Sequence, residues 1–362
     1  MKRFIILDVS RFLAALVVLN SHFVGILGLP FLENSPNFKL ALSFLWNGEA
    51  AVSYFFLLSG FVLAIKYLEE DFKLNLIEFY IQRIFRIYPL YIFMLLLSVF
   101  VINNATKIGI NPDLNKGFMS IPIGIVQFFR ECFLIFNTPS ISAKLIIPQS
   151  WTLSIEFIFS LLIPFMILIV RQSIFWLICA SLILLKLFQI DANIILFAMG
   201  IILAKMHTNN QIKIKNIYLP LLLLIGIFFF NFNFLFETRN KLTQYAIPFG
   251  SLLIFLFFLS KENTKSILQN VFLVKISNSS YSVYIVHMLI IKFFSLMIFH
   301  VILTSYPSLN NSTIWLFIYF ITLVFVIIFS MLCYHFIEKP FISLGKFVTL
   351  WLKKNLTKQY LK

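Results

Sequence analysis

The sequence is poor in charged residues. Only 12% of its 362 residues are Asp, Glu, Lys or Arg, about half the share usual in a soluble domain. Hydrophobic residues make up 60% of the chain, and Phe alone occurs 46 times. So little polar surface excludes a single water-soluble globule, and it favours a chain that exposes much of its surface to lipid.

Cysteines and metal-binding motifs are also scarce. The three cysteines are far apart, and an odd number argues against a framework of disulfide bonds; they are Cys132, Cys179 and Cys333. We expect all three to be packing residues. No CxxC pair and no HExxH motif occurs, so we expect no metal site.

The basic residues do not form the pattern of a nucleic-acid-binding protein. The net charge is +15, but no basic stripe is interleaved with aromatic residues. Lys and Arg gather instead at the ends of long apolar runs, which is typical of membrane proteins. We therefore expect a lipid bilayer, and no nucleic acid, as the partner of this surface.

The apolar runs predict an all-α, polytopic membrane protein with about ten spanning helices. The run that begins the chain contains Asp8 and Arg11 and has no A-x-A site, so we interpret it as a retained first helix and not as a signal peptide. Residues 118–137 are apolar but contain Pro122 and Gly124, and we interpret them as a half-helix or re-entrant segment. The predicted spans are 5–27, 44–65, 83–103, 150–170, 172–189, 191–206, 216–234, 243–260, 279–299 and 312–337.

The distribution of basic residues predicts the orientation. With ten spans, more than twice as many of the 29 Lys and Arg residues fall on the side of the N-terminus as on the other side. Both termini are therefore expected in the cytoplasm. No stretch is long enough for a soluble domain, so we expect one transmembrane domain over residues 1–345 and a basic cytoplasmic tail over 346–362.

Ionisable side chains inside spans mark candidate functional sites, because each costs about 2.5–3.5 kcal/mol or more at mid-membrane. Asp8 and Arg11 lie three residues apart in the first span and can form an ion pair. His22 follows Arg11 by eleven residues, about 20° from a whole number of turns. Arg11 and His22 should therefore share one helix face, Arg11 toward the cytoplasm and His22 toward the outer end. The alternative role for His22 is a polar contact between helices.

The third span carries two arginines, Arg83 and Arg86, on one face near its cytoplasmic end. A pair of guanidinium groups near a helix N-terminus suits a phosphate or pyrophosphate group. The alternative is ordinary anchoring of a helix end by basic residues.

Two further polar groups lie within later spans. Glu156 follows Trp151 at the start of the fourth span, and we expect it near the outer end, at the depth of His22, where it could orient a histidine or contact a sugar hydroxyl. Tyr281, Tyr284 and His287 form a polar set in the ninth span. Interfacial capping is the alternative for Glu156.

The ordered set of these motifs resembles the acyltransferase-3 family, and it covers essentially the whole chain. The residues that carry the resemblance are Asp8, Arg11 and His22, the run Phe55–Phe61, Arg83 and Arg86, the run Trp151–Glu156 with Pro164, the run Ser280–Tyr284 with His287, and Glu338-Lys339-Pro340. Two positions depart from the family pattern: Phe12 stands where glycine is frequent and Ser160 where tyrosine is frequent. Neither removes a proposed catalytic group, but both leave the acceptor class open.

The resemblance implies a membrane O-acyltransferase, commonly one that moves acetyl from acetyl-CoA to a hydroxyl of an extracytoplasmic glycan such as O-antigen or capsule. It also implies the inner membrane of a bacterium. The expected catalytic residues are then His22 as general base and Glu156 beside it. Arg83, Arg86 and Arg11 would bind the donor, with Asp8, Tyr281, Tyr284 and His287 supporting the site. Direct transfer and transient acylation of His22 remain alternative routes.

A second class of function fits the same composition. Charges and histidines inside the membrane also mark the paths of transporters, so a transporter or flippase for a glycan or a lipid-linked intermediate is the alternative. Internal symmetry or paired interrupted helices would favour transport. We find neither pattern in the sequence.

Overall fold

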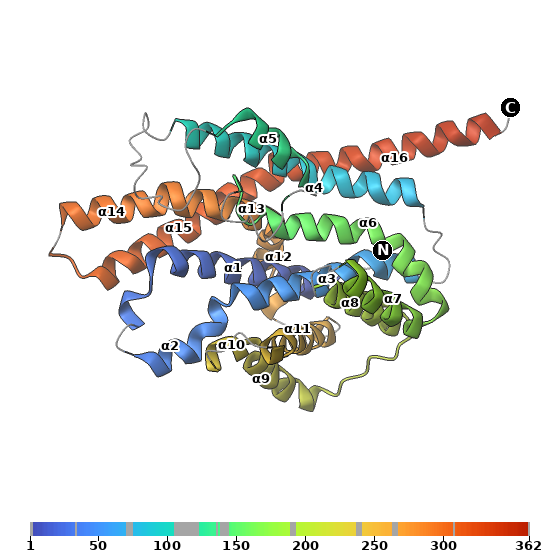
Figure 1. Ribbon diagram of the computed structural model, residues 1–362, viewed down its shortest axis with the longest axis horizontal. Helices are drawn as coiled ribbons and strands as arrows, with labels where there is room; N and C mark the ends of the chain where they lie inside the picture. Colours follow the sequence, from blue (N-terminus) through green and yellow to red (C-terminus); the bar gives the residue numbers. More distant parts are fainter. Residues whose placement is uncertain are drawn as a thin grey trace.

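The computed structural model describes residues 3–32, 35–69, 75–104, 123–134, 137, 145–188, 193–236, 241–262, 267–306 and 308–360. Within these ranges the chain forms helices and no strand, so the predicted all-α class is confirmed. The long helices run roughly side by side in one elongated bundle (Figure 1).

Among the described residues, six helical stretches are long and apolar enough to cross a membrane by themselves: Ile5–Leu27, Pro36–Leu68, Leu76–Asn103, Ser150–Gln172, Ser280–Ser305 and Asn311–Asn355. Shorter apolar helices cover Ile174–Lys186, Asn193–Thr208, Asn216–Phe230 and Tyr245–Lys261. Together they fit a polytopic membrane protein, as predicted. The number of crossings stays a prediction.

The helices have the following bounds. They are α1 (Ile5–Leu27), α2 (Pro36–Leu42), α3 (Gly48–Leu68), α4 (Leu76–Asn103), α5 (Ile125–Cys132), α6 (Ser150–Gln172), α7 (Ile174–Phe188), α8 (Asn193–Thr208), α9 (Leu219–Phe230), α10 (Phe232–Leu235), α11 (Lys241–Lys261), α12 (Val271–Ser277), α13 (Ser280–Ile290), α14 (Leu296–Ser305), α15 (Asn311–Cys333) and α16 (Lys339–Tyr360).

Helix α4 begins seven residues before the span predicted at 83–103. The Asn75 side chain caps it by accepting a hydrogen bond of 3.1 Å from the backbone N–H of Glu78. Arg83 and Arg86 therefore lie in the third and fourth turns of α4 and not at its start. In this register both side chains line one cavity, Arg83 buried and Arg86 exposed.

Two other segments can be compared with the predictions: 118–137, predicted as a half-helix or re-entrant segment, and the last predicted span. Within 118–137 the structure describes residues 123–134 and 137. Of these, Ile125–Cys132 form α5, which with eight residues is too short to cross a membrane. Residues 118–122 and 135–136 lie outside the described ranges. The last predicted span continues without a break from α15 into α16. The predicted domain boundary at residue 345 falls inside α16 and stays a prediction.

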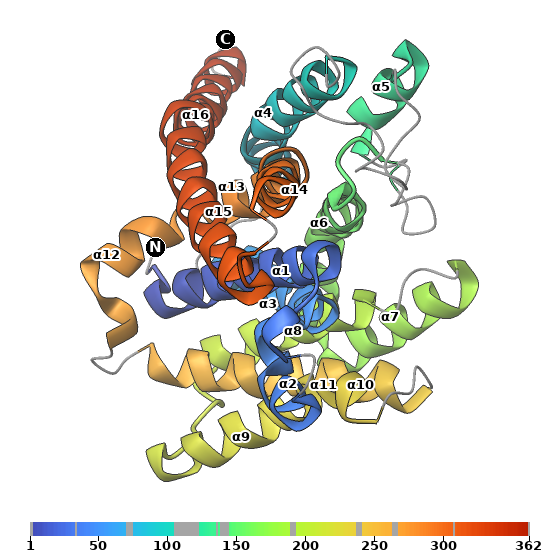
Figure 2. The same cartoon turned by 90° about the vertical axis from the view of Figure 1, so that its left-hand side faces the viewer.

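Helix α3 lies at the centre of the bundle, against α1, α8 and α11 (Figure 2). Gly60 of α3 and Gly200 of α8 allow the closest approach. A Cβ atom on Gly60 would overlap the carbonyl oxygen of Phe197, and one on Gly200 would overlap backbone atoms of α3. Small residues at such a crossing are a common means of packing helices in membranes. The contact fixes the position of Ser59, the neighbour of Gly60.

Two π-helical turns interrupt the last helices, at Ile291–Ser295 between α13 and α14 and at Tyr334–Glu338 between α15 and α16. Each contains one buried ionisable residue, Lys292 or Glu338. The Glu338 carboxylate accepts a hydrogen bond of 3.0 Å from Ser282 of α13. Because π-helical turns often occur at functional sites, they draw attention to the α13 side of the bundle.

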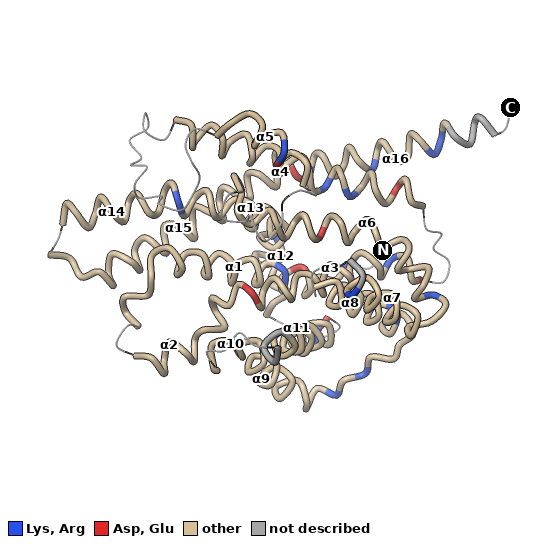
Figure 3. The backbone as a smooth tube through the Cα atoms, in the orientation of Figure 1, with Lys and Arg blue, Asp and Glu red and all other residues tan. Residues whose placement is uncertain are grey.

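Both described ends of the chain point toward one end of the bundle (Figure 1). Charged residues are sparse along the long helices (Figure 3), as membrane-spanning segments require. The cysteines form no disulfide: Cys132 and Cys179 are half-buried, and Cys333 is buried. The cytoplasmic location of the two termini stays a prediction.

Candidate active site

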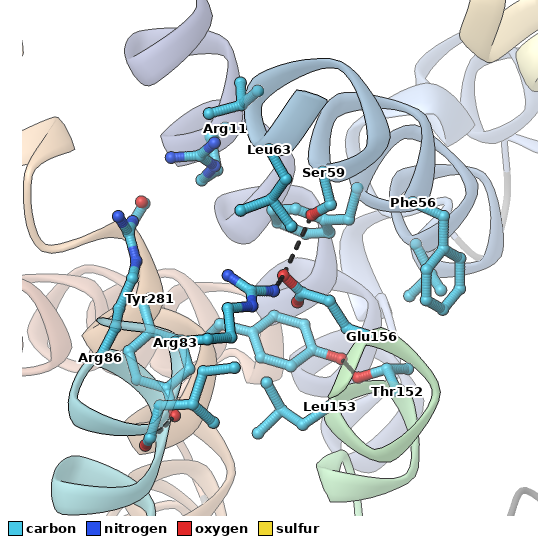
Figure 4. Close-up of a pocket in the computed structure, with 16 residues that line it drawn as sticks. Arg11, Phe56, Ser59, Leu63, Arg83, Arg86, Thr152, Leu153, Glu156 and Tyr281 are labelled. Atoms are coloured by element: carbon cyan, nitrogen blue, oxygen red, sulfur yellow. Dashed lines mark hydrogen bonds and ion pairs between the residues drawn. The ribbon is translucent and has the colours of Figure 1, made fainter. Parts of the chain in front are cut away.

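A cavity of about 90 Å³ lies where α1, α3, α4, α6 and α13 meet. Its wall is unusually polar for the interior of an apolar bundle, because three guanidinium groups, a carboxylate and two phenols reach it (Figure 4). These groups belong to Arg11, Arg83, Arg86, Glu156, Tyr281 and Tyr284. The structure therefore brings together residues from four helices, α1, α4, α6 and α13, that the sequence had marked one by one.

The centre of the cavity is an ion pair between Arg83 of α4 and Glu156 of α6. Glu156 also accepts a hydrogen bond of 3.1 Å from the Ser59 hydroxyl (Figure 4). The Arg83 side chain is buried. The Glu156 side chain is 25% exposed, so the pair is only partly buried. Separating the partners would still leave the buried Arg83 as an uncompensated charge.

Arg11 and Arg86 supply the remaining positive charge of the cavity. Arg11 forms an ion pair with Asp8 at 3.5 Å, which confirms the predicted pairing. Arg86 is exposed and forms no ion pair with any described residue. The cavity thus has more guanidinium groups than carboxylates, and Arg86 is the one available to an anion.

The two tyrosines line the α13 side of the cavity. The Tyr281 hydroxyl donates a hydrogen bond of 2.8 Å to the carbonyl oxygen of Ile87 in α4. The Tyr284 and Thr152 hydroxyls lie 2.5 Å apart (Figure 4). These bonds tie α13 to α4 and α6, so both phenols act as fixed walls.

The two histidines of the predicted site stack on each other outside this cavity. The ring centroids of His22 and His287 are 5.3 Å apart, with 27° between the ring planes. His287 is fully buried, whereas His22 is half-buried. The Tyr284 ring, which lines the cavity, lies 5.9 Å from the His287 ring. The histidine pair is therefore one helical turn of α13 away from the cavity wall.

The shared face of Arg11 and His22 is consistent with this arrangement. Arg11 lines the cavity with Tyr281 of α13, and His22 stacks on His287 of the same helix. Both side chains therefore meet α13, about 16 Å apart along α1.

The predicted depth of Glu156 is wrong. The carboxylate lies with Arg83, and His22 lies with His287. The reason is the start of α6: Ser150 is joined to Tyr91 through Asn137, and α4 continues for another twelve residues to Asn103, about 18 Å. Helix α6 thus begins inside the bundle and not at its outer end.

Sequence reasoning missed four polar residues near the site: Ser59, Thr152, Gln149 and Asn137. Ser59 and Thr152 were part of the motifs that carry the family resemblance, but no role was given to them. Gln149 and Asn137 lie outside every predicted span, so the criterion of polar residues within spans could not find them. Within the described residues, no group of His, Cys, Asp or Glu side chains is placed to hold a metal ion.

Comparison with known proteins gives two results. A family model described as an acyltransferase domain matches residues 4–334. A segment of 125 residues, 34% of this chain, is 35% identical to the acyltransferase MdmB of Streptomyces mycarofaciens. The match spans 30% of that relative's length. No solved structure matches the chain.

Proposed function

The chain belongs to this acyltransferase family, and from that premise we propose that it transfers an acyl group, most simply acetyl from acetyl-CoA, to a hydroxyl of an extracytoplasmic glycan. The observation that supports this function is the cavity with an excess of guanidinium groups next to a histidine pair. One part suits an anionic donor, and the other suits proton transfer from a hydroxyl.

The donor side is assigned to Arg86, with Arg11, which is paired with Asp8, adding positive charge to the same cavity. The phosphate groups of coenzyme A need cationic donors that are not already committed, and Arg86 has no ion pair among the described residues. Arg83 is held by Glu156, so its role is to shape the cavity together with that carboxylate. The thioester end of the donor would extend past Tyr281 and Tyr284 toward the histidines.

His22 is the proposed general base. As the acceptor oxygen attacks the thioester carbon, His22 removes the hydroxyl proton, the C–S bond breaks, and the proton is returned to the departing thiolate sulfur. A neutral imidazole is matched to this task near neutral pH. A route through an acyl-His22 intermediate would use the same groups in two steps.

The location follows from the family and the charge pattern. We propose the cytoplasmic membrane of a bacterium, with both termini in the cytoplasm and the acceptor on the opposite side. The polar cavity would then be reached by the donor from the cytoplasm. The bilayer, the acyl donor and a glycan or lipid-linked glycan are the expected partners.

The test is an acyl-transfer assay with the full chain in proteoliposomes. Radiolabelled acetyl-CoA is supplied together with a surface glycan isolated from a strain that lacks the gene, and label in the glycan is measured. The wild-type protein should label the glycan, and His22→Ala should not. If the wild-type protein binds coenzyme A but moves no label, the acetyl-to-glycan assignment is wrong.

A further inference from the structure

Three buried acceptor atoms near the histidine pair have no hydrogen-bond donor among the described residues: Nε2 of His287, Oε1 of Gln149 and Oδ1 of Asn137. The side chains are 0%, 2% and 1% exposed. Nearly all buried polar atoms in native proteins are paired. Three unpaired atoms of one kind in one region therefore call for a ligand that donates hydrogen bonds.

The other polar end of each side chain is already fixed, so none of the three can be turned around. Nδ1 of His287 lies 3.2 Å from the carbonyl oxygen of Val283. A carbonyl oxygen only accepts, so Nδ1 carries the proton and Nε2 presents a lone pair. The Gln149 amide donates to the carbonyl oxygens of Ile285 at 2.8 Å and Tyr284 at 3.3 Å, which leaves its own oxygen as the unpaired end.

Asn137 is oriented by the same logic. The Tyr91 hydroxyl donates to the carbonyl oxygen of Glu131 at 2.6 Å, so it can only accept from Asn137. The Asn137 amide donates to it at 3.0 Å and to the Ser150 hydroxyl at 2.9 Å. The Glu131 carboxylate accepts hydrogen bonds from the Ile146 backbone and from Gln127, and these bonds hold the segment near Asn137 in place. Burial raises the pKa of this carboxyl.

The three side chains form one connected series, through hydrogen bonds and backbone neighbours. Gln149 bonds to the carbonyl oxygens of Tyr284 and Ile285, which in a helix point toward the next turn, the turn of His287. Gln149 is followed by Ser150, which bonds to Asn137. His22 lies at one end of this series, because its ring stacks on that of His287. A ligand with several donor groups could contact the three side chains while one of the ligand's hydroxyls faced His22.

The chemistry of the three atoms selects the class of ligand. All three are neutral acceptors, and no carboxylate or thiolate is among them to compensate a metal cation. None of the three groups carries a negative charge that could pair with an organic cation, so a cationic ligand is disfavoured here as well. A neutral compound with several hydroxyl groups remains, because hydroxyls donate hydrogen bonds without carrying charge.

We propose that His287, Gln149 and Asn137 bind the acyl acceptor and select a polyhydroxylated one, such as a sugar. The proposal rests on the function proposed above, because it places the acceptor beside His22. It assigns the three residues a role in binding, while proton removal stays with His22.

The test compares two acceptors that differ in their number of hydroxyls, butyl β-D-glucopyranoside and n-butanol, with radiolabelled acetyl-CoA as donor and the full chain in proteoliposomes. The wild-type protein should use the glucoside at least about tenfold better, judged by kcat/KM. Gln149→Met and His287→Asn should each raise KM for the glucoside about 3- to 10-fold, the usual effect of losing one neutral hydrogen bond. Their kcat/KM for n-butanol should fall by less than that for the glucoside, because n-butanol has only one hydroxyl and cannot make all of these hydrogen bonds.

Two features keep the test decisive. His287→Asn retains an amide donor for the Val283 carbonyl. Thr322→Val is the control: it removes a buried hydroxyl that already pairs with Ser295 at 2.6 Å, so it should leave kcat/KM unchanged for both acceptors. Coenzyme A binding by each variant reports whether it has folded. If both acceptors are used equally, or if the variants impair both to the same extent, the three atoms form a structural network bridged by water and the proposal is wrong. Transfer to neither acceptor by donor-bound wild-type protein would contradict the proposed function as well.

Discussion

The guanidinium cavity and the histidine region are neighbours on α13, yet their chemistry is opposite. The cavity contains Arg11, Arg83, Arg86 and Glu156, with charge that is only partly compensated. The region around His22 and His287 contains neutral acceptor atoms that are closed off from solvent. An excess of positive charge attracts an anion, whereas unpaired neutral acceptors attract hydroxyl groups. Under the proposed function, donor and acceptor would enter from separate sides and meet near Tyr284.

The sharpest test of this comparison is the topology, because it predicts an all-or-none result. A reporter fused at Lys362 should be on the cytoplasmic side, and one inserted after Ser308, between α14 and α15, should be on the other side. Two reporter enzymes, one active only in the cytoplasm and the other only outside it, are fused at each site, and their activities show on which side of the membrane the site lies. Both sites on the same side would contradict the ten-span arrangement and the separate entry of donor and acceptor.

The histidine region should be far more sensitive in catalysis than in donor binding. His22→Ala should lower acyl transfer by about 10²–10⁴, the usual contribution of a general base, with unchanged affinity for coenzyme A. His22→Gln keeps hydrogen bonding but cannot take up a proton, so it should be as inactive. Transfer rate and equilibrium binding are measured on the same preparation. Near-normal turnover of His22→Gln would make His22 a packing residue, and His287 would become the candidate base.

The ion pair in the cavity should show the opposite pattern, a large effect on stability. Glu156→Ala leaves the buried Arg83 without its partner, which typically costs about 3–5 kcal/mol. Arg83→Ala should cost less, because the Glu156 side chain that it leaves is 25% exposed. Thermal unfolding in detergent measures the loss. The double variant Arg83→Met with Glu156→Leu should recover part of it, since no unpaired charge remains. Additive losses in the double variant would mean that the two side chains do not stabilise each other.

Arg86 should give a smaller effect, confined to the donor. Arg86→Ala removes the guanidinium that has no ion pair with a described residue, and we expect affinity for coenzyme A to fall about 10- to 100-fold, the range for hydrogen bonds to a charged group. Arg86→Lys should restore it only in part, because an ammonium lacks the planar fork. Calorimetric titration measures the affinity, and Arg130→Ala on α5 serves as the control. Unchanged affinity in Arg86→Ala would return this residue to anchoring the helix end.

Relations within a single helix could be predicted from the sequence. The ion pair of Asp8 and Arg11 is found as expected, and Arg11 and His22 both meet α13. The period of 3.6 residues per turn determines such relations, and it requires no knowledge of neighbouring helices. The apolar length of the runs was equally informative, because the thickness of a bilayer sets it.

Relations between helices could not be predicted in this way. Glu156 was expected beside His22 but pairs with Arg83, since α6 starts next to Tyr91 inside the bundle. The contribution of Gln149 and Asn137 was missed because both lie between helices. Nothing in the hydropathy of a segment states the depth at which its helix begins.

The sequence by itself thus determined the helical, membrane-spanning class of this protein and the set of ionisable residues that need a function. Both follow from local properties, namely the apolar length of each run and the energetic cost of charge in lipid. Only the tertiary structure decided which carboxylate pairs with which guanidinium group and which two imidazole rings stack on each other. Arg83 and Glu156 are 73 residues apart in the chain, and close packing at Gly60 and Gly200 sets the positions of the helices. Such contacts depend on how far each helix is shifted along its axis relative to its neighbours. Side-chain packing between helices determines this shift, so it cannot be derived from any one segment.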